Sequence, residues 1–389
     1  MTKLAGGRYR FRNTDEGERV KSELRAAEAV VIGGGVIGVS TLYHLAAAGV
    51  TDAVLLERET LGAGSTSAAA GGVRVQYSDS LNVQISLLAI ERFTRFRDDF
   101  DIDIGFRQNG YLFLLEERMM PAFEAATALQ RSLGAPTRMV SLAEAADRVP
   151  GLCLDGLAGA SFCPIDGVAT PEAVVQGYAA AARRLGARTL VGHTARAVRT
   201  EGGRVTGVET DRGFLATPRV ICAAGVDSTA IAATAGVDLP VRAERRYIYY
   251  VEQRGTLPAS LPLTVDFATG LYVHPEGPGL IVGGPWATTA DLAPYAVARL
   301  PALADLPIRS GWSGNYEMSP DHNAMVGAAT DPAGFYYATG FSGHGFQQAP
   351  VVGEYLAALV AGRPPSLDLG GLSADRFADA RTRHEANVI

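Results

Sequence analysis

The sequence predicts two discontinuous domains, an α/β domain of the Rossmann type and a second, α+β domain built on a mixed sheet. Three observations support this prediction. The chain has 389 residues, which is more than one ordinary compact core accommodates. A strand, a glycine-rich turn and a helix follow one another near the N-terminus, and the same order recurs near the C-terminus. The region between these two units contains helical stretches and a long strand-rich part.

The composition is that of an ordinary globular protein, with 47% hydrophobic and 20% charged residues. The net charge of −6 gives no electrostatic reason to expect a nucleic-acid partner, which would need a basic face. No run reaches 18 apolar residues, so we expect no membrane span. Residues 1–28 are polar, lack the apolar core of a signal peptide, and are expected to form an N-terminal extension.

The cysteines and histidines show no pattern of a structural or catalytic metal site. The 3 cysteines are too few and too scattered for a disulfide framework or a zinc site, and the 6 histidines have no metal-ligand spacing. We therefore expect reduced cysteines, a cytoplasmic location and no bound metal.

The first landmark is the stretch 29–57. Residues 29–32, AVVI, predict a buried strand, and Gly33, Gly35 and Gly38 follow it as G-x-G-x-x-G. The next residues predict a helix up to Gly49, and a second strand ends at Glu57. The first glycine permits the turn, the second lets the backbone approach a pyrophosphate, and the third lets helix and strand pack closely. The helix start favours phosphate, and the Glu57 carboxylate suits ribose hydroxyls, so this stretch predicts a dinucleotide site.

The residues after Glu57 favour FAD over a nicotinamide nucleotide. A nicotinamide fold would normally continue with another helix and strand, whereas this chain has a loop of small residues, LGAGSTSAAAGG. Such a loop suits backbone lying against an extended ligand. Ser65 and Thr66 are placed to donate hydroxyls to the pyrophosphate, and Gly71 and Gly72 let the chain pass the flavin ring.

The remaining elements follow from periodicity and from their stop signals. Helices are expected at 80–100, 119–135, 141–149 and 171–185, with Pro171 in the first turn of the last of these. Strands are expected at 110–115 and in the hairpin-containing stretch 188–225, and further strands at 245–253, 270–277 and 279–285 form the mixed sheet. A last strand at 334–340 leads through the glycine loop GFSGHGF into a helix at about 348–360.

From the glycine motif and the GAGSTS loop onward, the chain resembles the flavin-dependent amine and amino-acid oxidoreductases of the D-amino-acid oxidase superfamily. Within it the likeness is greatest to monomeric sarcosine oxidase, the β subunits of sarcosine oxidase and amino-acid dehydrogenase complexes, and a related flavoprotein linked to respiratory-complex assembly. The resemblance covers nearly the whole chain after residue 28. It implies an FAD-binding domain from 29–88, 150–226 and 313–389, and a substrate domain from 89–149 and 227–312.

The resemblance also implies how the cofactor is held. The strand near Ala195 would offer backbone groups to the adenine, and the second glycine loop would lie against the flavin ring. The helix after this loop would point at the pyrimidine edge, with Gln347 donating to a ring oxygen. His344 contacts the flavin or makes a structural hydrogen bond. The residues expected to bind the cofactor are Gly33, Gly35, Val36, Ile37, Gly38, Glu57, Arg58, Ser65, Thr66, Gly71, Gly72, Ala195, Ala224, Gly225, Gly340, Gly343, His344, Gly345, Phe346 and Gln347.

For the substrate, the resemblance points to Arg74, Tyr272 and Tyr316. Arg74 would hold a carboxylate through two parallel hydrogen bonds. Tyr316 stands where D-amino-acid and glycine oxidases carry an arginine. His274 shares a strand face with Tyr272, although the sequence leaves open whether His274 faces the flavin or lies in the core or on the surface.

Three departures from the family pattern refine these expectations. Gly314 stands where monomeric sarcosine oxidase has its flavin-linking cysteine, and Ser67-Ala68 stand where relatives have a linking histidine, so we expect noncovalent FAD. Ile281 replaces the lysine that activates oxygen, which favours a dehydrogenase over an oxidase. Gln347 replaces a lysine of the substrate clamp, which argues against sarcosine itself.

The leading functional hypothesis is an FAD-dependent oxidoreductase that oxidises a C–N bond of an amino acid or N-alkyl amine by hydride transfer to flavin N5. Water then hydrolyses the imine, and electrons pass to oxygen or to a partner protein. Two alternatives remain open: a 2-hydroxy-acid dehydrogenase on the same fold, and a flavoprotein subunit or assembly partner with little turnover of its own. The sequence does not decide the substrate, its stereochemistry or the oligomeric state.

Overall fold

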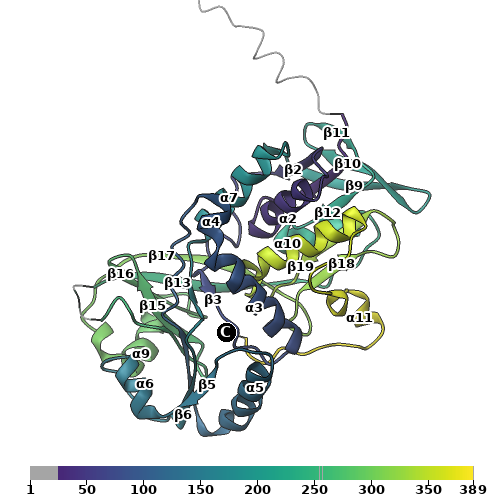
Figure 1. Cartoon of the computed structure of the whole chain (residues 1–389). Coiled ribbons are helices and arrows are strands. Elements are labelled where there is room, and N and C mark those ends of the chain that lie inside the picture. Colours follow the sequence, from purple (N-terminus) through teal and green to yellow (C-terminus); the bar gives the residue numbers. More distant parts are fainter. Residues whose placement is uncertain (1–24, 254, 256, 389) are drawn as a thin grey trace, which may run out of the picture.

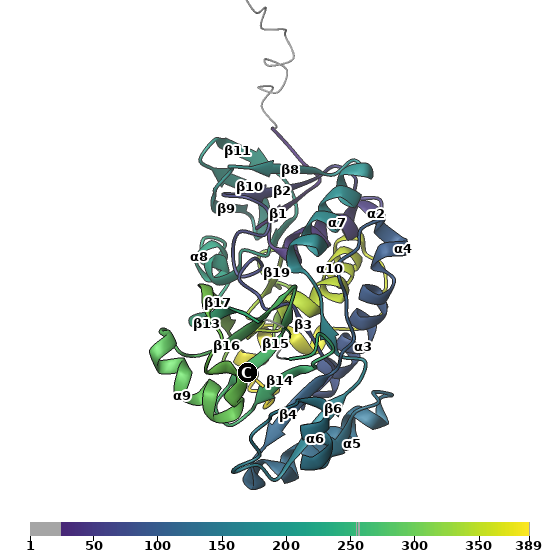
Figure 2. The same ribbon diagram turned by 90° about the vertical axis from the view of Figure 1, so that its left-hand side faces the viewer.

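The computed structural model describes residues 25–253, 255 and 257–388, which fold around two large sheets (Figures 1 and 2). One sheet lies with α2, α7 and α10 in the upper part of Figure 1, and the other lies with α5, α6 and α9 in the lower part. This arrangement confirms the predicted fold class, a Rossmann-type α/β layer combined with a mixed-sheet layer. Most of the expected extension, residues 1–24, lies outside the described residues.

The first sheet has six strands, and all of its neighbours are parallel except the edge pair β18–β19. Its central strands are apolar and fully buried because both faces are covered. In spatial order the strands are β18 (Met325–Ala328), β19 (Phe335–Thr339), β12 (Val220–Cys222), β1 (Ala29–Ile32), β2 (Ala53–Glu57) and β8 (Arg188–Val191).

Helices cover one face of this sheet, and a small three-stranded sheet covers the other. Val31 and Leu55 point into the helical core, whereas Val30 and Val54 point into the opposite core. The helices are α2 (Val36–Ala47), α3 (Ser80–Thr94), α4 (Phe96–Phe100), α7 (Pro171–Arg184) and α10 (Gly345–Ala361). The opposite layer is β9 (Ala195–Glu201), β10 (Arg204–Thr210), β11 (Gly213–Ala216) and α8 (Ser228–Ala233), preceded by η2 (Gly225–Asp227).

The second sheet has eight strands and is mixed, because β14 and β4 run parallel while the other neighbours are antiparallel. Its order is β17 (Ile308–Met318), β13 (Arg242–Glu252), β16 (Gly279–Gly284), β15 (Leu271–Glu276), β14 (Leu263–Asp266), β4 (Tyr111–Leu115), β6 (Gly159–Cys163) and β5 (Arg138–Val140). The helices packed on it are α5 (Met120–Ser132), α6 (Leu142–Arg148) and α9 (Thr289–Arg299), with η1 (Glu117–Met119) and η3 (Pro301–Leu303) beside them.

Short elements complete the chain. The two-stranded sheet of β3 (Gly72–Val73) and β7 (Gly167–Val168) carries the segment that follows the small-residue loop. After α10 come η4 (Gly370–Leu372) and α11 (Asp375–Ala378), and the chain then returns toward the middle of the molecule, in yellow in Figure 1. No helix within the described part of the chain is both long and apolar enough to cross a membrane.

The elements differ from the expected segments at five places. β6 lies in the range assigned to the FAD-binding domain, but it pairs with β4 and β5 in the eight-stranded sheet. The boundary at 313 falls inside β17, and the one at 88 falls inside α3, since helix and strand continue through both positions. The helix expected at 80–100 is broken into α3 and α4 at Arg95, and α10 begins three residues earlier than expected. Apart from these points, the domain division stays a prediction.

The close packing of α2 on β1 depends on Gly38. A Cβ at this position would lie 1.9 Å from the carbonyl oxygen of Gly33, which is backbone and cannot rotate away. We predict that Gly38→Ala lowers the free energy of unfolding by roughly 3 kcal/mol, the upper part of the usual range for overpacking. Gly64→Ala is the matched control, because no atom lies within 4 Å of its Cβ position. Urea unfolding of both variants measures the difference, and equal stabilities would contradict the packing argument.

Candidate active site

One cavity joins the starts of α2 and α10 and extends to the second sheet. Among the residues predicted to bind the cofactor, all except Gly38 and Gly340 line it. Of the residues predicted to act on the substrate, Arg74, Tyr272 and Tyr316 line it, whereas His274 does not. The two glycine loops, about 310 residues apart in the sequence, therefore face one space.

At the start of α2, Gly33 and Gly35 are glycines for different structural reasons. Gly33 has a φ of +108°, which an L side chain rarely adopts. Gly35 has the Thr66 hydroxyl oxygen close to its free side, where an added Cβ would lie 3.3 Å from that atom. That hydroxyl accepts a hydrogen bond from Val36 N at 3.1 Å, so its proton is still free to donate. A helix start that lines a cavity in this way is suited to a phosphate group.

Glu57 and Arg58 line the cavity together with Ala195 at the start of β9. The Glu57 carboxylate accepts hydrogen bonds from Gly34 N and Glu59 N, both at 2.7 Å, which fixes its direction. Arg58 pairs with Asp227 at 2.9 Å. A held carboxylate retains lone pairs for two further hydroxyl donors, as a ribose would require.

The small-residue loop is held differently from the expectation. The Ser65 hydroxyl donates to the carbonyl of Asn315 at 2.8 Å, so its proton is not directed at a phosphate. The free side of Gly71 faces the carbonyl oxygen of Ala169, and that of Gly72 faces the Tyr111 hydroxyl, each within 2.3 Å of an added Cβ. The absence of a side chain at these two glycines therefore makes room for a backbone carbonyl and a tyrosine hydroxyl of the protein, whereas the sequence suggested room for a flavin ring.

At the start of α10, the N–H groups of Gly345, Phe346 and Gln347 have no partner within the described part of the chain. Gly343 before them has a φ of +92°, and its free side faces the ring of Tyr316. Unpaired N–H groups and the positive end of a 17-residue helix can stabilise negative charge on a ligand. Gly340 stands behind the loop, where its N–H donates to Glu317.

The Gln347 side chain was expected to donate to a ring oxygen, but its amide is engaged elsewhere. Its Oε1 accepts from Arg74 N at 3.0 Å, and its Nε2 donates to Arg74 O and to Ser86 Oγ, both at 2.9 Å. Both amide protons are therefore used within the protein. Gln347 fixes the backbone of Arg74, and only its backbone N–H remains directed at the cavity.

The Arg74 guanidinium is buried, with 3% of the residue exposed. It donates to the carbonyls of Gln76 and Asn387, both at 2.6 Å, and stacks on the Tyr77 ring at 4.0 Å. No carboxylate among the described residues lies within ion-pair distance of it. A buried cation with carbonyl partners alone is suited to an incoming anion.

Neutral aromatic side chains surround this arginine. Burial raises the pKa of the tyrosines, so their hydroxyls stay protonated at neutral pH; they are Tyr77, Tyr111, Tyr272 and Tyr316. Burial, aided by the nearby Arg74 charge, holds the pKa of His344 well below its usual range. His344 Nε2 lies 3.4 Å from Arg74 Nη2, so the uncharged ring contacts the arginine.

His274 shares the strand face of Tyr272 but lies one rung further along β15, in the core. Its Nδ1 lies 2.9 Å from the carbonyl of Pro275, and burial lowers its pKa to about 4. Of the readings that the sequence left open, the structure places this histidine in the core.

Among the polar residues that line the cavity and that sequence reasoning missed are Tyr77, Tyr111, Arg246 and Glu317. Each comes from a segment that gives no local motif. Arg246 lies over the Tyr316 ring at 5.1 Å, and Tyr111 begins a strand that appeared to be only core. The one available signal was Gly72, since a glycine with a normal φ inside a strand indicates close approach by another group.

The donors of this cavity fit FAD. The start of α2 and the Thr66 hydroxyl suit phosphates, the Glu57 carboxylate suits ribose hydroxyls, and the start of α10 suits negative charge on the ring. A cavity of this kind, on this fold, defines a dinucleotide-dependent oxidoreductase.

Comparison with known proteins agrees. Residues 28–359 match the family described as FAD dependent oxidoreductase, and the chain belongs to this family. It is 31% identical to sarcosine dehydrogenase, mitochondrial, of Homo sapiens, over 92% of this chain and 42% of that protein. It is 29% identical to 4-methylaminobutanoate oxidase (formaldehyde-forming) of Paenarthrobacter nicotinovorans, over 90% of this chain and 45% of that protein. The chain thus spans less than half of the length of these relatives.

Among solved structures, L-proline dehydrogenase from P. horikoshii superposes with a TM-score of 0.85 at 30% identity, covering 93% of this chain and 100% of that one. Glycine oxidase from Geobacillus kaustophilus has a TM-score of 0.80 at 23% identity, which supports the fold alone.

Glu317 provides a test of the cavity by pH. Its Oε2 accepts from Thr339 Oγ1 and Gly340 N, and burial raises its pKa to about 7 from an ordinary 4.5. The folded state then holds a proton that the unfolded state loses, so stability falls as pH rises from about 4.5 to about 7. We predict that the free energy of unfolding of Glu317→Gln decreases by about 2 kcal/mol less than that of the wild type over this pH range. This value allows for solvent in the cavity.

The measurement is the free energy of unfolding of the cofactor-free protein and the variant between pH 5 and 8. Asp166, whose pKa burial also raises to about 7, contributes equally to both proteins and cancels. Parallel curves for the two proteins would contradict the assignment to Glu317.

Proposed function

We propose that this protein oxidises a secondary amine that carries a carboxylate, an N-alkyl or cyclic amino acid, with FAD as the hydride acceptor. The observation that supports this most directly is Arg74, a buried guanidinium without an acidic partner among the described residues, in the cavity that α10 enters with free N–H groups. A substrate carboxylate would complete its hydrogen bonds. The carbon next to the nitrogen would then be held at a fixed place in the cavity.

The cofactor would be held by the groups already described. The start of α2 and the Thr66 hydroxyl would bind the phosphates, Glu57 the ribose, and the start of α10 the pyrimidine edge of the ring. When bound, FAD supplies the two-electron chemistry by taking a hydride from the substrate carbon. We propose that it is noncovalent, because Gly314 and Ala68, which contact each other, are the residues at the two family linkage positions.

The chamber around Arg74 would bind the amine in its neutral form. The tyrosines are protonated and His344 is uncharged, so these side chains offer no anion to an ammonium group. The positive charge of Arg74 disfavours a second cation nearby. The rate should therefore rise with pH as the substrate nitrogen loses its proton, whereas a 2-hydroxy acid would show no such dependence.

The relatives support an amine substrate. The names of the human and Paenarthrobacter proteins and of the P. horikoshii structure specify sarcosine, 4-methylaminobutanoate and L-proline, which are all secondary amines with a carboxylate. This shared chemistry, and not any one of the three compounds, is what we carry over to the chain.

We propose that electrons leave to a protein or small-molecule acceptor more readily than to oxygen. Ile281, at the family position of the oxygen-activating lysine, packs in the core with Leu263 and Val265. No lysine occurs among the described residues, since Lys3 and Lys21 are the only two in the sequence. The cytoplasmic location also remains a proposal, supported by the unpaired state of Cys153, Cys163 and Cys222.

The substrate proposal is tested by anaerobic mixing of the yellow protein with N-methyl amino acids, cyclic amino acids and 2-hydroxy acids. Loss of the ~450 nm flavin band with the first two groups is the expected result. Arg74→Ala should lower kcat/KM about 10- to 100-fold, because a hydrogen-bonded charge pair is lost. Arg95→Ala, an exposed arginine paired with Asp99, is the control and should not change it.

Two results would overturn the proposal. Bleaching by 2-hydroxy acids alone would replace the amine by an alcohol substrate. Bleaching by no compound in the panel would favour a flavoprotein subunit with little turnover of its own.

The noncovalent linkage has its own test. Precipitation of the holoprotein with acid should leave a colourless pellet and release all of the flavin into the supernatant. The Gly314→Cys variant, which introduces a cysteine at the family linkage position, is the comparison for a covalently bound flavin. Its Cβ would lie 2.6 Å from the Cβ of Ala68, so the loop must shift slightly to accept it. A wild-type pellet that stays yellow after repeated washing would show a covalent bond.

A further inference from the structure

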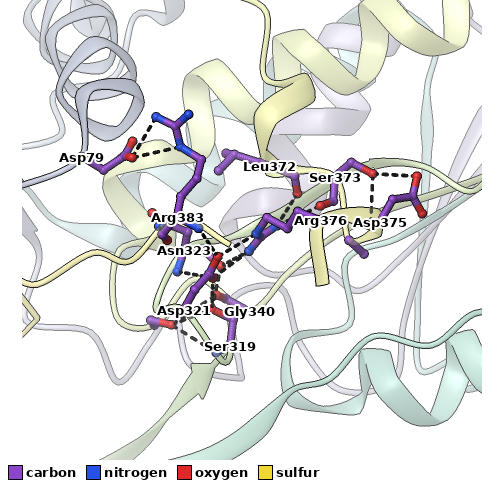
Figure 3. A network of polar contacts seen from close by, with 12 residues as sticks. Asp79, Ser319, Asp321, Asn323, Gly340, Leu372, Ser373, Asp375, Arg376 and Arg383 are labelled. Carbon is purple, nitrogen blue, oxygen red and sulfur yellow. Dashed lines mark hydrogen bonds and ion pairs between the residues drawn. The ribbon is translucent and has the colours of Figure 1, made fainter. Parts of the chain in front are cut away.

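Residues 376–388, here called the tail segment, return from α11 to the wall of the cavity beside Arg74. Figure 3 shows the polar network that holds the first part of this segment. We infer that the tail segment is a positioning element for Arg74: Glu385 and Asn387 fix the direction of its guanidinium and thereby set how strongly the site prefers a carboxylate. The inference rests on the proposed role of Arg74 in binding the substrate.

The first anchor of the tail segment is a buried ion pair. Arg376 Nε and Nη2 donate to the two carboxylate oxygens of Asp321 at 2.8 and 2.9 Å, and both side chains are less than 5% exposed. Asp321 also accepts from Arg383 N at 3.1 Å, as Figure 3 illustrates. Asp321 therefore holds the chain at two points, at Arg376 through a bidentate ion pair and at Arg383 through a backbone hydrogen bond. Together these contacts fix the direction in which the chain leaves α11.

The second anchor is Glu385, which is fully buried. Its carboxylate accepts from the N–H and hydroxyl of Ser78, at 2.9 and 2.7 Å, and from Asp79 N at 3.1 Å. It also accepts from Asn82 Nδ2 at 3.0 Å and from Asn387 N at 2.9 Å. Five donors satisfy the buried charge, so this residue ties the tail segment to the start of α3.

Glu385 is connected to Arg74 through one residue, Asn387, whose N–H donates to the Glu385 carboxylate. Asn387 O accepts from Arg74 Nη2 at 2.6 Å, and Asn387 Nδ2 donates to Gln76 O at 3.3 Å. Gln76 O is the second acceptor of the guanidinium, from Nη1 at 2.6 Å. Both carbonyls that orient Arg74 are therefore held by Asn387, one as its own atom and one through its side chain.

This arrangement has a consequence for specificity. An arginine binds a carboxylate with two parallel hydrogen bonds only when its planar fork has the right direction. The backbone of Arg74 is fixed by Gln347, but four rotatable bonds separate that backbone from the guanidinium. The tail segment supplies the distant constraint. Without it we expect the arginine to stay charged and buried but to lose much of its preference for two parallel acceptors.

The test measures how much more tightly the site binds a carboxylate than an amide. A general loss of packing would weaken the binding of both compounds and leave this ratio unchanged. The holoprotein is titrated with pyrrole-2-carboxylate and with pyrrole-2-carboxamide, a planar pair that resists oxidation and differs only in charge and acceptor pattern. Perturbation of the flavin spectrum gives both dissociation constants. For the wild type we expect the carboxylate to bind about 10- to 100-fold more tightly. The proteins compared are the wild type, Glu385→Gln, Asn387→Ala, Arg74→Ala and Arg381→Ala.

Glu385→Gln should reduce the preference to about threefold or less, and Asn387→Ala should reduce it by a smaller factor in the same direction. Arg74→Ala should abolish it. Arg381→Ala, an exposed tail-segment residue paired with Asp379, should leave it unchanged. Flavin content and melting temperature of each variant identify any that fail to fold, and Asn387→Ala then carries the test because it removes a single hydrogen bond.

The outcomes separate the two proposals. If Arg74→Ala abolishes the preference while both Glu385→Gln and Asn387→Ala retain the wild-type value, the positioning role is wrong and the proposed function stands. If the wild type shows no preference, or Arg74→Ala keeps it, the proposed role of Arg74 fails, and the inference fails with it.

Discussion

The structure depends on the contact between α2 and α10. A Cβ on Gly353 would lie 2.8 Å from the carbonyl carbon of Ser40, so the two helices meet backbone to backbone. The Ser40 hydroxyl donates to Ala349 O at 2.7 Å across this contact. Both helices follow strands of the same sheet, β1 and β19, and their starts are therefore brought to the same edge. Two helix dipoles then point at one cavity, which favours an elongated ligand with negative charge at two places.

The second sheet completes the site through a repeated pairing of glycine with tyrosine. The space beside Gly72 holds the Tyr111 hydroxyl. In the same way, the ring of Tyr316 fills the space beside Gly343, and the ring of Tyr272 fills the space beside Gly283. In each pair the partners are at least 11 residues apart, and each tyrosine lines the cavity. The missing side chains let bulky, neutral aromatic groups come close to the backbone, so uncharged aromatic side chains form much of the cavity wall around Arg74.

These features explain what the sequence could and could not predict. Gly33, Gly35, Gly38 and Glu57 lie within one strand–helix–strand unit, so local spacing was enough to assign each its structural role. The placement of β6 depended on pairing with β4, about fifty residues earlier, and no local signal specifies which sheet a short apolar strand joins. For Gln347 the residue type and helix position suggested a ligand, but its partner, Arg74, is 273 residues away. The strand–helix–strand unit could be predicted because its interactions are local. The partners of Gly71, Gly72 and the Gln347 side chain could not, because each of them contacts a segment that is distant in the sequence.

The charge distribution within the cavity also constrains the chemistry. The cavity is lined by the Glu57 carboxylate, by the starts of α2 and α10, and by a region in which Arg74 stands among neutral tyrosines. A zwitterionic amino acid brings one negative and one positive group, and this last region offers a partner only for the negative one. Under the proposed function, transfer of an ammonium group into such surroundings would be costly, so the proton would be lost to solvent before or during binding and no side chain would be needed as a general base. In its proposed role the arginine would have two effects, since it would attract the carboxylate and would lower the proton affinity of the nitrogen from which the reaction proceeds. A precise direction of the guanidinium matters for both effects, which gives the buried network around Glu385 a physical reason to be as extensive as it is.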